Sequence, residues 1–212
     1  MGGSALESTL CGGADPVRLI ETLLWDGTAY PRLGGHLARL SASARRLGFA
    51  CDMTTVRAAL PAPECAARVR LTLGAAGDVA VTAAALPAAQ PVWRLALAQA
   101  VLTPDDPWLA VKSTRRAVYD SARAALPEGV EELIFRNTRD EICEGTITNI
   151  FFDRGQGLCT PPLACGLLPG VLRAEMIAQG CREAVLRAED LGQVRLWVGN
   201  ALRGRMEARW LG

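Results

Sequence analysis

Lys112 is the only lysine among the 23 lysine and arginine residues of this 212-residue chain. An arginine guanidinium stays protonated and cannot form an imine, whereas a desolvated lysine amine can lose its proton and attack a carbonyl group. Because arginine occupies every other basic position, the one retained lysine is a candidate nucleophile. A surface lysine that persists by chance is the alternative, so the surrounding motifs must decide.

Two glutamates lie in the strand-like stretch Glu141–Asp153. Glu141 and Glu144 are three residues apart, so the alternation of a strand places their side chains on opposite faces, and only one can point at a given site. Glu144 precedes Gly145, which leaves room for a planar ring to approach. Both a functional acid and an ordinary solvated carboxylate fit this spacing.

A proline and a glycine mark a helix start that resembles an anion-binding site. Pro169 presets the first helical turn, and Gly170 allows close approach of a ligand. The free N–H groups of Gly170, Val171 and Leu172 would then point toward the helix start, where the helix dipole favours an anion. Many ordinary helices also begin with Pro-Gly, so this alternative stays open.

Three further polar residues are candidates for the same site. Arg39 lies in a predicted helix and can pair bidentately with a phosphate. Asn200 follows a predicted strand and can donate an amide hydrogen bond, although a plain turn residue fits equally well. His36 is the only histidine, and a packed or capping role suits it better than a role as a catalytic base.

A lysine, an acid and a group of anion donors are the three requirements of a pyridoxal-phosphate site. The lysine forms an imine with the cofactor aldehyde, and the donors bind the phosphate. The acid keeps the pyridine nitrogen protonated, so that the ring can accept electrons from the substrate. The sequence therefore favours pyridoxal 5'-phosphate as the cofactor.

Composition excludes several other classes. The net charge is +1 and no basic stripe is present, which argues against nucleic-acid binding. No apolar stretch approaches the roughly 18 to 20 residues that span a membrane, and Met1–Ser4 lacks the features of a signal peptide, so we expect a cytoplasmic protein. Seven cysteines without a C-x-x-C pair, and one histidine, supply a metal site poorly. We therefore expect no metal, and cysteines that act as small buried apolar residues.

The elements that must position these residues indicate an α+β fold in two parts. Hairpin signals outnumber strand–helix–strand units, which excludes a doubly wound parallel sheet. The proline-flanked segment Leu86–Pro91 is the predicted linker. We accordingly expect a small α+β domain over residues 1–88 and a larger domain over residues 89–212.

Hydrophobic periodicity and turn residues predict the individual elements. The predicted strands are Arg18–Trp25, Arg68–Leu73, Val79–Leu86, Trp93–Val101, Glu131–Arg136, Glu141–Asp153, Leu158–Thr160, Val185–Ala188 and Val194–Val198. The predicted helices are Gly35–Phe49, Thr54–Leu60, Thr114–Leu126 and Pro169–Gln179. Asp26 and Gly27 offer the turn of a hairpin that would continue into Thr28–Leu33.

In this order the motifs resemble those of the class-IV aminotransferase family, the fold-type IV pyridoxal-phosphate enzymes. Glu144–Phe151 resembles the family signature E-G-x-x-x-N-[ILV]-F and is the most specific segment. Leu167–Arg173 resembles the G-x-L-x-G-[IV]-x-R segment, and His36–Leu40 resembles the H-L-x-R-L helix. The resemblance extends over about residues 19–209, nearly the whole chain.

The resemblance implies a fold and a role for each candidate residue. A small N-terminal α+β domain would precede a larger C-terminal domain of mixed sheet or barrel with helices, usually in a homodimer. Lys112 would bind the cofactor covalently and then move the α-proton of a small amino-acid-like substrate, while Glu144 would hold the pyridine nitrogen. The phosphate would be bound by Arg39, Gly170, Val171, Leu172 and Asn200.

Within the family, two segments are more similar to the lyase branch. Val198–Gly204 resembles its N-[AS]-L-x-G segment, and Lys112–Arg116 is close to its K-T-x-N-R pattern, with Arg115 in place of the asparagine. The implied reaction is the elimination of pyruvate from 4-amino-4-deoxychorismate to give 4-aminobenzoate for folate synthesis. An aminotransferase acting on branched-chain or D-amino acids is the alternative. A non-catalytic paralogue is a third, but such a chain would be free to replace its only lysine.

Overall fold

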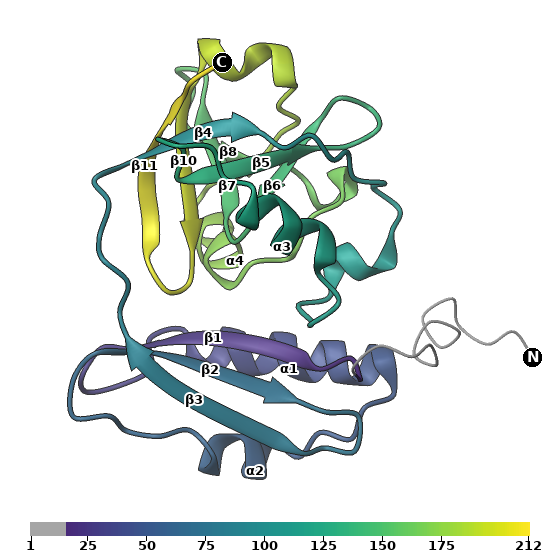
Figure 1. The fold of residues 1–212 in the computed structure, drawn as a ribbon, viewed down its shortest axis with the longest axis vertical. Helices are drawn as coiled ribbons and strands as arrows, with labels where there is room; N and C mark the ends of the chain where they lie inside the picture. The colour runs from purple at the N-terminus through teal and green to yellow at the C-terminus, as the bar shows by residue number, and fades with distance from the viewer. Residues whose placement is uncertain (1–15) are drawn as a thin grey trace, which may run out of the picture. The chain divides into compact units, whose positions relative to one another are not determined.

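The computed structural model describes residues 16–212, which form two compact units. One unit holds the described residues up to Pro87 together with Val111–Arg115, and the other holds Ala88–Ala110 with Arg116–Gly212 (Figure 1). Each unit has its own β-sheet. The expected α+β class is confirmed, and the short segment that carries Lys112 belongs to the first unit.

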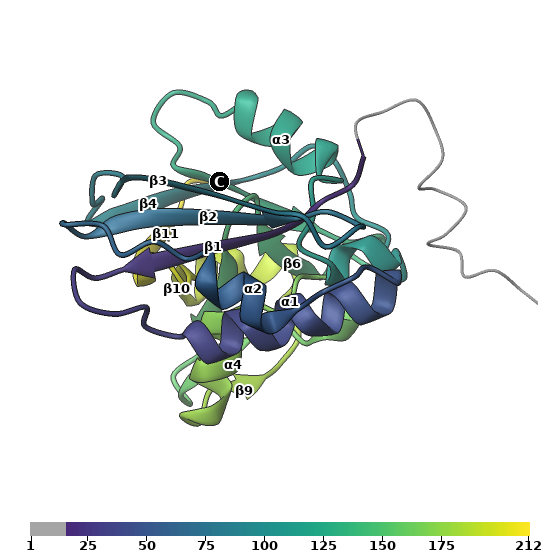
Figure 2. The ribbon, with the colours of Figure 1, turned by 90° about the horizontal axis from the view of Figure 1, so that it is seen from below.

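The first unit is a three-stranded antiparallel sheet in the order β1-β2-β3, with a helix packed on β1 (Figure 2). Its elements are β1 (Leu19–Trp25), α1 (Leu33–Leu47), α2 (Met53–Ala58), β2 (Ala67–Leu73) and β3 (Val79–Ala85). Every second residue of β2 is buried, as expected for a strand with one face on a core. Helix α1 buries residues at helical spacing and ends at Gly48, whose φ of 69° suits a glycine.

The hairpin expected after β1 is wrong. Asp26 and Gly27 do form a turn, in which Asp26 Oδ1 accepts hydrogen bonds from the backbone N–H groups of Thr28 and Ala29, both at 2.8 Å. The chain then enters α1, and β1 pairs along its whole length with β2 instead. Local turn chemistry was therefore predicted correctly, but the strand that pairs with β1 comes from later in the sequence.

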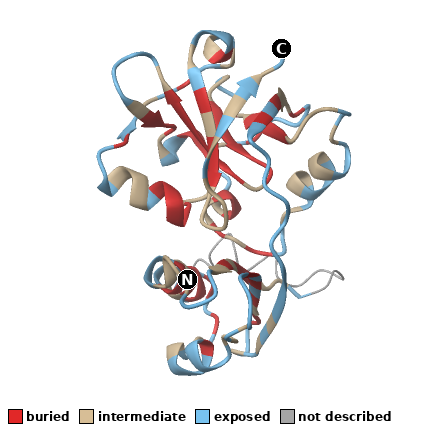
Figure 3. Cartoon of the chain, turned by 90° about the vertical axis from the view of Figure 1, so that its left-hand side faces the viewer, coloured by how far each residue is buried: buried red, intermediate tan, exposed pale blue. Residues whose placement is uncertain are grey.

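The second unit is built on a mixed eight-stranded sheet in the order β10-β11-β4-β5-β6-β7-β8-β9. Because β7 also pairs with β10, the six strands from β10 to β7 close into a barrel. Its strands are β4 (Val92–Leu97), β5 (Glu132–Arg136), β6 (Ile142–Gly145), β7 (Asn149–Asp153), β8 (Leu158–Thr160), β9 (Arg182–Glu183), β10 (Arg195–Asn200) and β11 (Gly204–Trp210). Figure 3 shows the buried residues concentrated on these strands.

Two helices and three 3-10 turns accompany this barrel. They are η2 (Pro107–Ala110), α3 (Ala117–Ala124), η3 (Leu163–Cys165), α4 (Val171–Ala178) and η4 (Ala188–Gln193). Over residues 16–212 no helix has both the length and the apolar composition that a membrane span needs. Four of the six described cysteines are buried, whereas Cys51 is half-buried and Cys65 is exposed. Cys11 lies outside the described residues.

Two strand predictions in this unit are wrong, and one strand was missed. Glu141–Asp153 is not one strand but the antiparallel pair β6 and β7, joined by a turn. Val185–Ala188 is not a strand, since β9 ends at Glu183 and η4 begins at Ala188. Strand β11 was missed, although charged and apolar residues alternate strictly along Arg205–Trp210, which is the period of a half-buried strand.

Candidate active site

The backbone of Lys112 is fixed as an extension of the sheet in the first unit. Ile20 N donates to Lys112 O at 2.8 Å, and Thr114 N donates to Arg18 O at 2.9 Å. These bonds place residues 112–114 beside β1, the strand at one edge of the sheet. Ser113 is buried while Lys112 is half-buried, so strand alternation directs the lysine side chain away from the face on which Ser113 lies. The backbone of the candidate nucleophile is therefore held in place by hydrogen bonds to β1 and the residue before it.

Arg39, the predicted phosphate ligand of the same unit, has its guanidinium oriented by a buried carboxylate. Nε and Nη2 of Arg39 donate to the two oxygens of Glu21 in β1, at 2.9 and 2.6 Å. His36 Nδ1 lies 2.6 Å from the same carboxylate, and His36 is buried, as expected for a packed histidine. A phosphate role of Arg39 stays a prediction, and Glu21 is the residue that holds its side chain.

Glu21 was missed by the sequence analysis. It is 3% exposed inside an otherwise apolar strand, and a carboxylate at such a position needs a charged partner. Burial raises the pKa of the Glu21 carboxyl, but the charge of Arg39 and the hydrogen bonds from His36 and Arg39 outweigh burial and bring the pKa below its usual value. A lone glutamate within an apolar strand was the available signal.

The structure distinguishes the two glutamates that the sequence left open. Glu144 is buried in β6, and its Oε1 accepts a hydrogen bond of 2.7 Å from the hydroxyl of Tyr119 on α3. Glu141 instead accepts hydrogen bonds from Asn137 at 2.8 Å and Arg139 at 3.0 Å, within its own turn. Glu141 is thus used for local structure, and Glu144 is the buried acid of the pair.

Tyr119 is a second residue that sequence reasoning could not place. Its ring packs edge-on against Phe135, with centroids 5.1 Å apart. Burial, followed by the neighbouring charge of Glu144, raises the pKa of the Tyr119 phenol far above its usual value. The hydroxyl therefore remains protonated at any working pH and always has a hydrogen to donate to Glu144.

The predicted anion cradle at the start of α4 is anchored by Asn149 of β7. Asn149 Nδ2 donates to Leu168 O at 3.0 Å, and Gly170 is the N-cap residue, without a side chain to cap the helix. A Cβ at position 170 would collide with the side-chain oxygen of Asn149, so a larger residue there would displace the side chain that holds Leu168. Val171 and Leu172 are the first helical residues, and N–H groups at such positions have no acceptor inside the helix.

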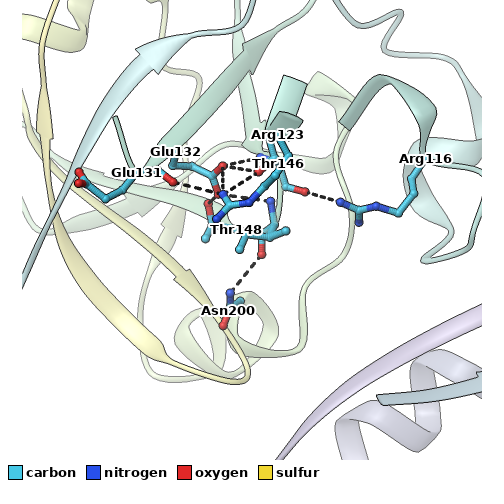
Figure 4. A network of polar contacts seen from close by, with 8 residues as sticks. Arg116, Arg123, Glu131, Glu132, Thr146, Thr148 and Asn200 are labelled. Carbon is cyan, nitrogen blue, oxygen red and sulfur yellow. Dashed lines mark hydrogen bonds and ion pairs between the residues drawn. The ribbon is translucent and has the colours of Figure 1, made fainter. Parts of the chain in front are cut away.

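Asn200 links two turns of the barrel. Its Oδ1 accepts hydrogen bonds from the backbone N–H groups of Leu202 and Arg203 at 3.1 and 3.0 Å. Its Nδ2 donates to Ile147 O at 3.2 Å, in the turn between β6 and β7 (Figure 4). The turn role considered for Asn200 is thus observed, and its phosphate role stays a prediction.

Residues 18–209 match the model of the amino-transferase class IV family. The chain belongs to this family. The resemblance found in the motifs is therefore confirmed, and so is the expectation of a pyridoxal-phosphate-dependent enzyme. The individual roles of the candidate residues remain predictions.

Other proteins are similar over most of the chain. A Schizosaccharomyces pombe protein named "Putative aminodeoxychorismate lyase" is 31% identical over 172 residues, which cover 76% of this chain and 74% of that protein. The solved structure of a "Putative amino-acid aminotransferase" from Mesorhizobium loti has a TM-score of 0.86 at 43% identity, over 92% of this chain and 100% of that one. A hypothetical aminotransferase from Mycobacterium tuberculosis, in a PLP-bound form, shares the fold with a TM-score of 0.80 at 23% identity, over 92% and 81%.

Each unit, taken by itself, carries groups of the kinds that the cofactor of this family needs. Lys112 supplies an amine on a fixed backbone, and Glu144 supplies a buried carboxylate held by a phenol. The start of α4 supplies N–H groups at a position where a Cβ cannot be accommodated. Lys112 and Arg39 belong to the first unit, while Glu144, Gly170 and Asn200 belong to the second.

Proposed function

We propose that the chain is a pyridoxal-phosphate-dependent 4-amino-4-deoxychorismate lyase, which releases pyruvate and leaves 4-aminobenzoate, a precursor for folate. The observation that carries this proposal is the 31% identity to the S. pombe lyase-named protein, over about three quarters of both chains. The lyase-like segment Val198–Gly204 supports the same branch of the family.

In this proposal Lys112 holds the cofactor covalently and, once its amine is free and neutral, removes the proton from the substrate carbon that bears the amino group. Bound pyridoxal phosphate supplies an electron-accepting ring conjugated to that carbon. Glu144 keeps the ring nitrogen protonated. The phosphate is held by Arg39, Gly170, Val171, Leu172 and Asn200.

The elimination needs no oxidant. The substrate loses the proton that Lys112 accepts, and the bond between the ring carbon and the oxygen that carries the enolpyruvyl group breaks, so that this oxygen leaves with the group. The electron pair of the broken C–H bond stays in the six-membered ring, which becomes aromatic, and the leaving group takes up a proton to become pyruvate. Lys112 therefore has to do no more than hold and return one proton.

An amino-acid aminotransferase is the second candidate, and a specific observation favours it. The M. loti structure named as an amino-acid aminotransferase is 43% identical to this chain and is covered over its full length. Both reactions begin with the same removal of a proton by Lys112, so the residues named above serve either. They differ in whether the substrate then loses a leaving group or gives up its amino group.

The products separate the two candidates. The purified chain, loaded with pyridoxal phosphate, is supplied with 4-amino-4-deoxychorismate without a keto acid, and 4-aminobenzoate and pyruvate are quantified. We expect equal amounts of both, and none with the Lys112→Ala variant. Amine transfer from branched-chain or D-amino acids that requires a keto acid, with no 4-aminobenzoate formed, would overturn the lyase proposal in favour of the aminotransferase.

We also propose, from the family resemblance, that the chain acts as a cytoplasmic homodimer. Light scattering should then give twice the 22.5 kDa mass of one chain. A mass of one chain at micromolar concentration would contradict the dimer and leave the proposed reaction untouched.

A further inference from the structure

A buried glutamate in β5 accepts hydrogen bonds from the turn that joins β6 to β7. Glu132 is 0% exposed, and its carboxylate accepts hydrogen bonds from the backbone N–H groups of Thr146 and Ile147, at 3.1 and 3.3 Å. It also accepts from the hydroxyls of Thr146 and Thr148, the latter at 2.9 Å. Arg123 adds a charged contact at 3.3 Å (Figure 4). Four donors of this turn thus meet at one carboxylate, and Thr146 N is shared with Leu133 O at 3.1 Å.

The outer side of the turn is fixed as well. Arg116 Nη2 donates to Thr146 O at 3.0 Å, and Asn200 Nδ2 donates to Ile147 O at 3.2 Å. Gly145 N closes the turn on Thr148 O at 2.8 Å. The carbonyl groups of Thr146 and Ile147 thus accept from Arg116 and Asn200, and the N–H groups of the same two residues donate to Glu132. Glu132 therefore supplies an acceptor for both N–H groups.

An ionised carboxylate suits this position because it only accepts hydrogen bonds, with two oxygens and about four lone-pair sites. A glutamine in the same place would point an NH₂ group at one side of the array. The N–H group of Ile147 cannot reverse its role there, although the hydroxyl of Thr148 can. The array around Glu132 is therefore matched to an acid rather than to an amide of the same shape.

The contact with Glu132 accounts for three residues of the family signature segment, Gly145, Thr146 and Thr148. A Cβ on Gly145 would lie 2.8 Å from Cγ and Cδ of Glu132 and would collide with the hydroxyl of Thr148. Gly145 therefore leaves the space that Glu132 fills, and the two threonines supply hydroxyls to its carboxylate. The segment Glu144–Asn149 thus provides both the space and the hydrogen-bond donors for the side chain of Glu132.

The turn directly adjoins both residues that matter for the proposed site. Glu144 and Asn149 face each other in the register of β6 and β7, on either side of the turn. Glu144 meets Tyr119, and Asn149 holds Leu168 at the start of α4. A change in the turn would therefore displace the buried acid and the anion cradle together.

We infer that Glu132 is a positioning residue, which holds the turn Thr146–Thr148 and thereby sets Glu144 and Asn149 for the cofactor. The inference rests on the proposed role of Glu144 in holding the ring nitrogen. Glu132 acts through these residues and touches neither substrate nor cofactor.

The affinity for pyridoxal phosphate tests this inference without any product assay. Glu132→Gln should weaken the binding of the cofactor to the apo-protein by about tenfold or more, because small displacements of a positioned group are costly. The matched control is Glu131→Gln, which alters the neighbouring carboxylate, paired with the exposed Arg94, and should stay within about twofold of wild type. A Glu132→Gln variant with wild-type affinity would overturn the inference.

A double-mutant cycle distinguishes positioning from general damage. If Glu132 acts partly through Glu144, the loss of affinity in the double variant should be smaller than the product of the two single losses, and the remaining effect of Glu132→Gln comes through Asn149. Losses that simply multiply in the double variant would contradict the route through Glu144. A wild-type protein that binds the cofactor but makes no 4-aminobenzoate would overturn only the lyase proposal.

Thr148 provides a second test in case the Glu132→Gln variant does not fold. Thr148→Val removes one hydroxyl donor at nearly constant volume and should weaken cofactor affinity in the same direction, by less. Thr148→Ser keeps the hydroxyl and should retain most of the wild-type affinity. Equal affinities for the valine and serine variants would overturn the inference.

Discussion

Glu21 in the first unit and Glu132 in the second are buried glutamates on strands, and they are held in opposite ways. Glu21 faces the guanidinium of Arg39 through two hydrogen bonds, with His36 beside it. Glu132 faces mainly neutral donors, the hydroxyls and N–H groups of the turn after Gly145, and Arg123 reaches it at 3.3 Å. The carboxylate of Glu21 orients the guanidinium of Arg39, and the carboxylate of Glu132 holds the backbone of the turn between β6 and β7.

The pKa values of the two acids follow from this difference. Burial raises both, but the charge of Arg39 brings the pKa of Glu21 below its usual value, whereas the pKa of Glu132 stays raised because its neutral donors and Arg123 compensate only part of the burial. Equal burial therefore does not mean equal electrostatics. The pKa of a buried acid therefore depends on the charge of the groups that donate hydrogen bonds to it.

The largest effect is expected at Glu21. Glu21→Gln removes the buried carboxylate charge that faces the half-buried guanidinium of Arg39 and should lower the free energy of unfolding by about 3 to 5 kcal/mol. Urea denaturation of the apo-protein measures this change. As a control, Asp78→Asn breaks the exposed ion pair with Arg18 and should have a far smaller effect. Similar losses in the two variants would break the distinction between buried and exposed pairs.

Glu132→Gln should cost less, about 1 to 3 kcal/mol, because mostly neutral donors lose part of their acceptor. The same urea denaturation places the two variants on one scale. If Glu132→Gln proves more destabilising than Glu21→Gln, the contrast between a charge-paired and a turn-shaping carboxylate is wrong.

The pH dependence of stability should have opposite signs at the two sites. The pKa of Glu21 is lowered in the folded state, so its contribution is present above the usual value near 4.5 and is lost as the pH falls through the folded pKa. The pKa of Glu132 is raised, so its contribution is greatest below that value and declines as the pH rises through the folded pKa. Denaturation of wild type and both glutamine variants between about pH 3 and pH 8 tests this; penalties of the same slope would contradict the comparison.

The smallest effect is expected at Tyr119. Tyr119→Phe removes one hydrogen bond to Glu144, worth about 1 kcal/mol, and should weaken cofactor affinity by about fivefold. The other tyrosine provides the control, since Tyr30 donates to Pro61 O in the first unit. Tyr30→Phe should leave cofactor affinity unchanged. Equal affinities of the two variants would show that the phenol does not support Glu144.

The parts of the fold that sequence predicts are those set by local patterns. Helix α1 and the hairpin of β2 and β3 follow from periodicity and turn residues, and both are confirmed. The lone lysine and the glycine at position 170 can also be recognised from the sequence by their residue types alone. These features need no knowledge of what packs against them.

The parts that sequence missed depend on partners distant in the chain. Thr146 and Thr148 are β-branched and favour a strand, but Glu132 draws their hydroxyls into a turn, so tertiary contact overrides propensity. Glu21 looks like an exception in an apolar strand until Arg39 is known to lie beside it. Neither acid can be given a role from its own neighbours in the sequence.

The attachment of the cofactor to Lys112 can be tested directly, because the polypeptide offers only one other primary amine, its α-amino group. The protein loaded with pyridoxal phosphate is reduced with borohydride, digested and analysed by mass spectrometry. We expect the mass of the reduced cofactor on the peptide that contains Lys112. An unmodified Lys112 peptide, or label confined to the α-amino group, would contradict the account.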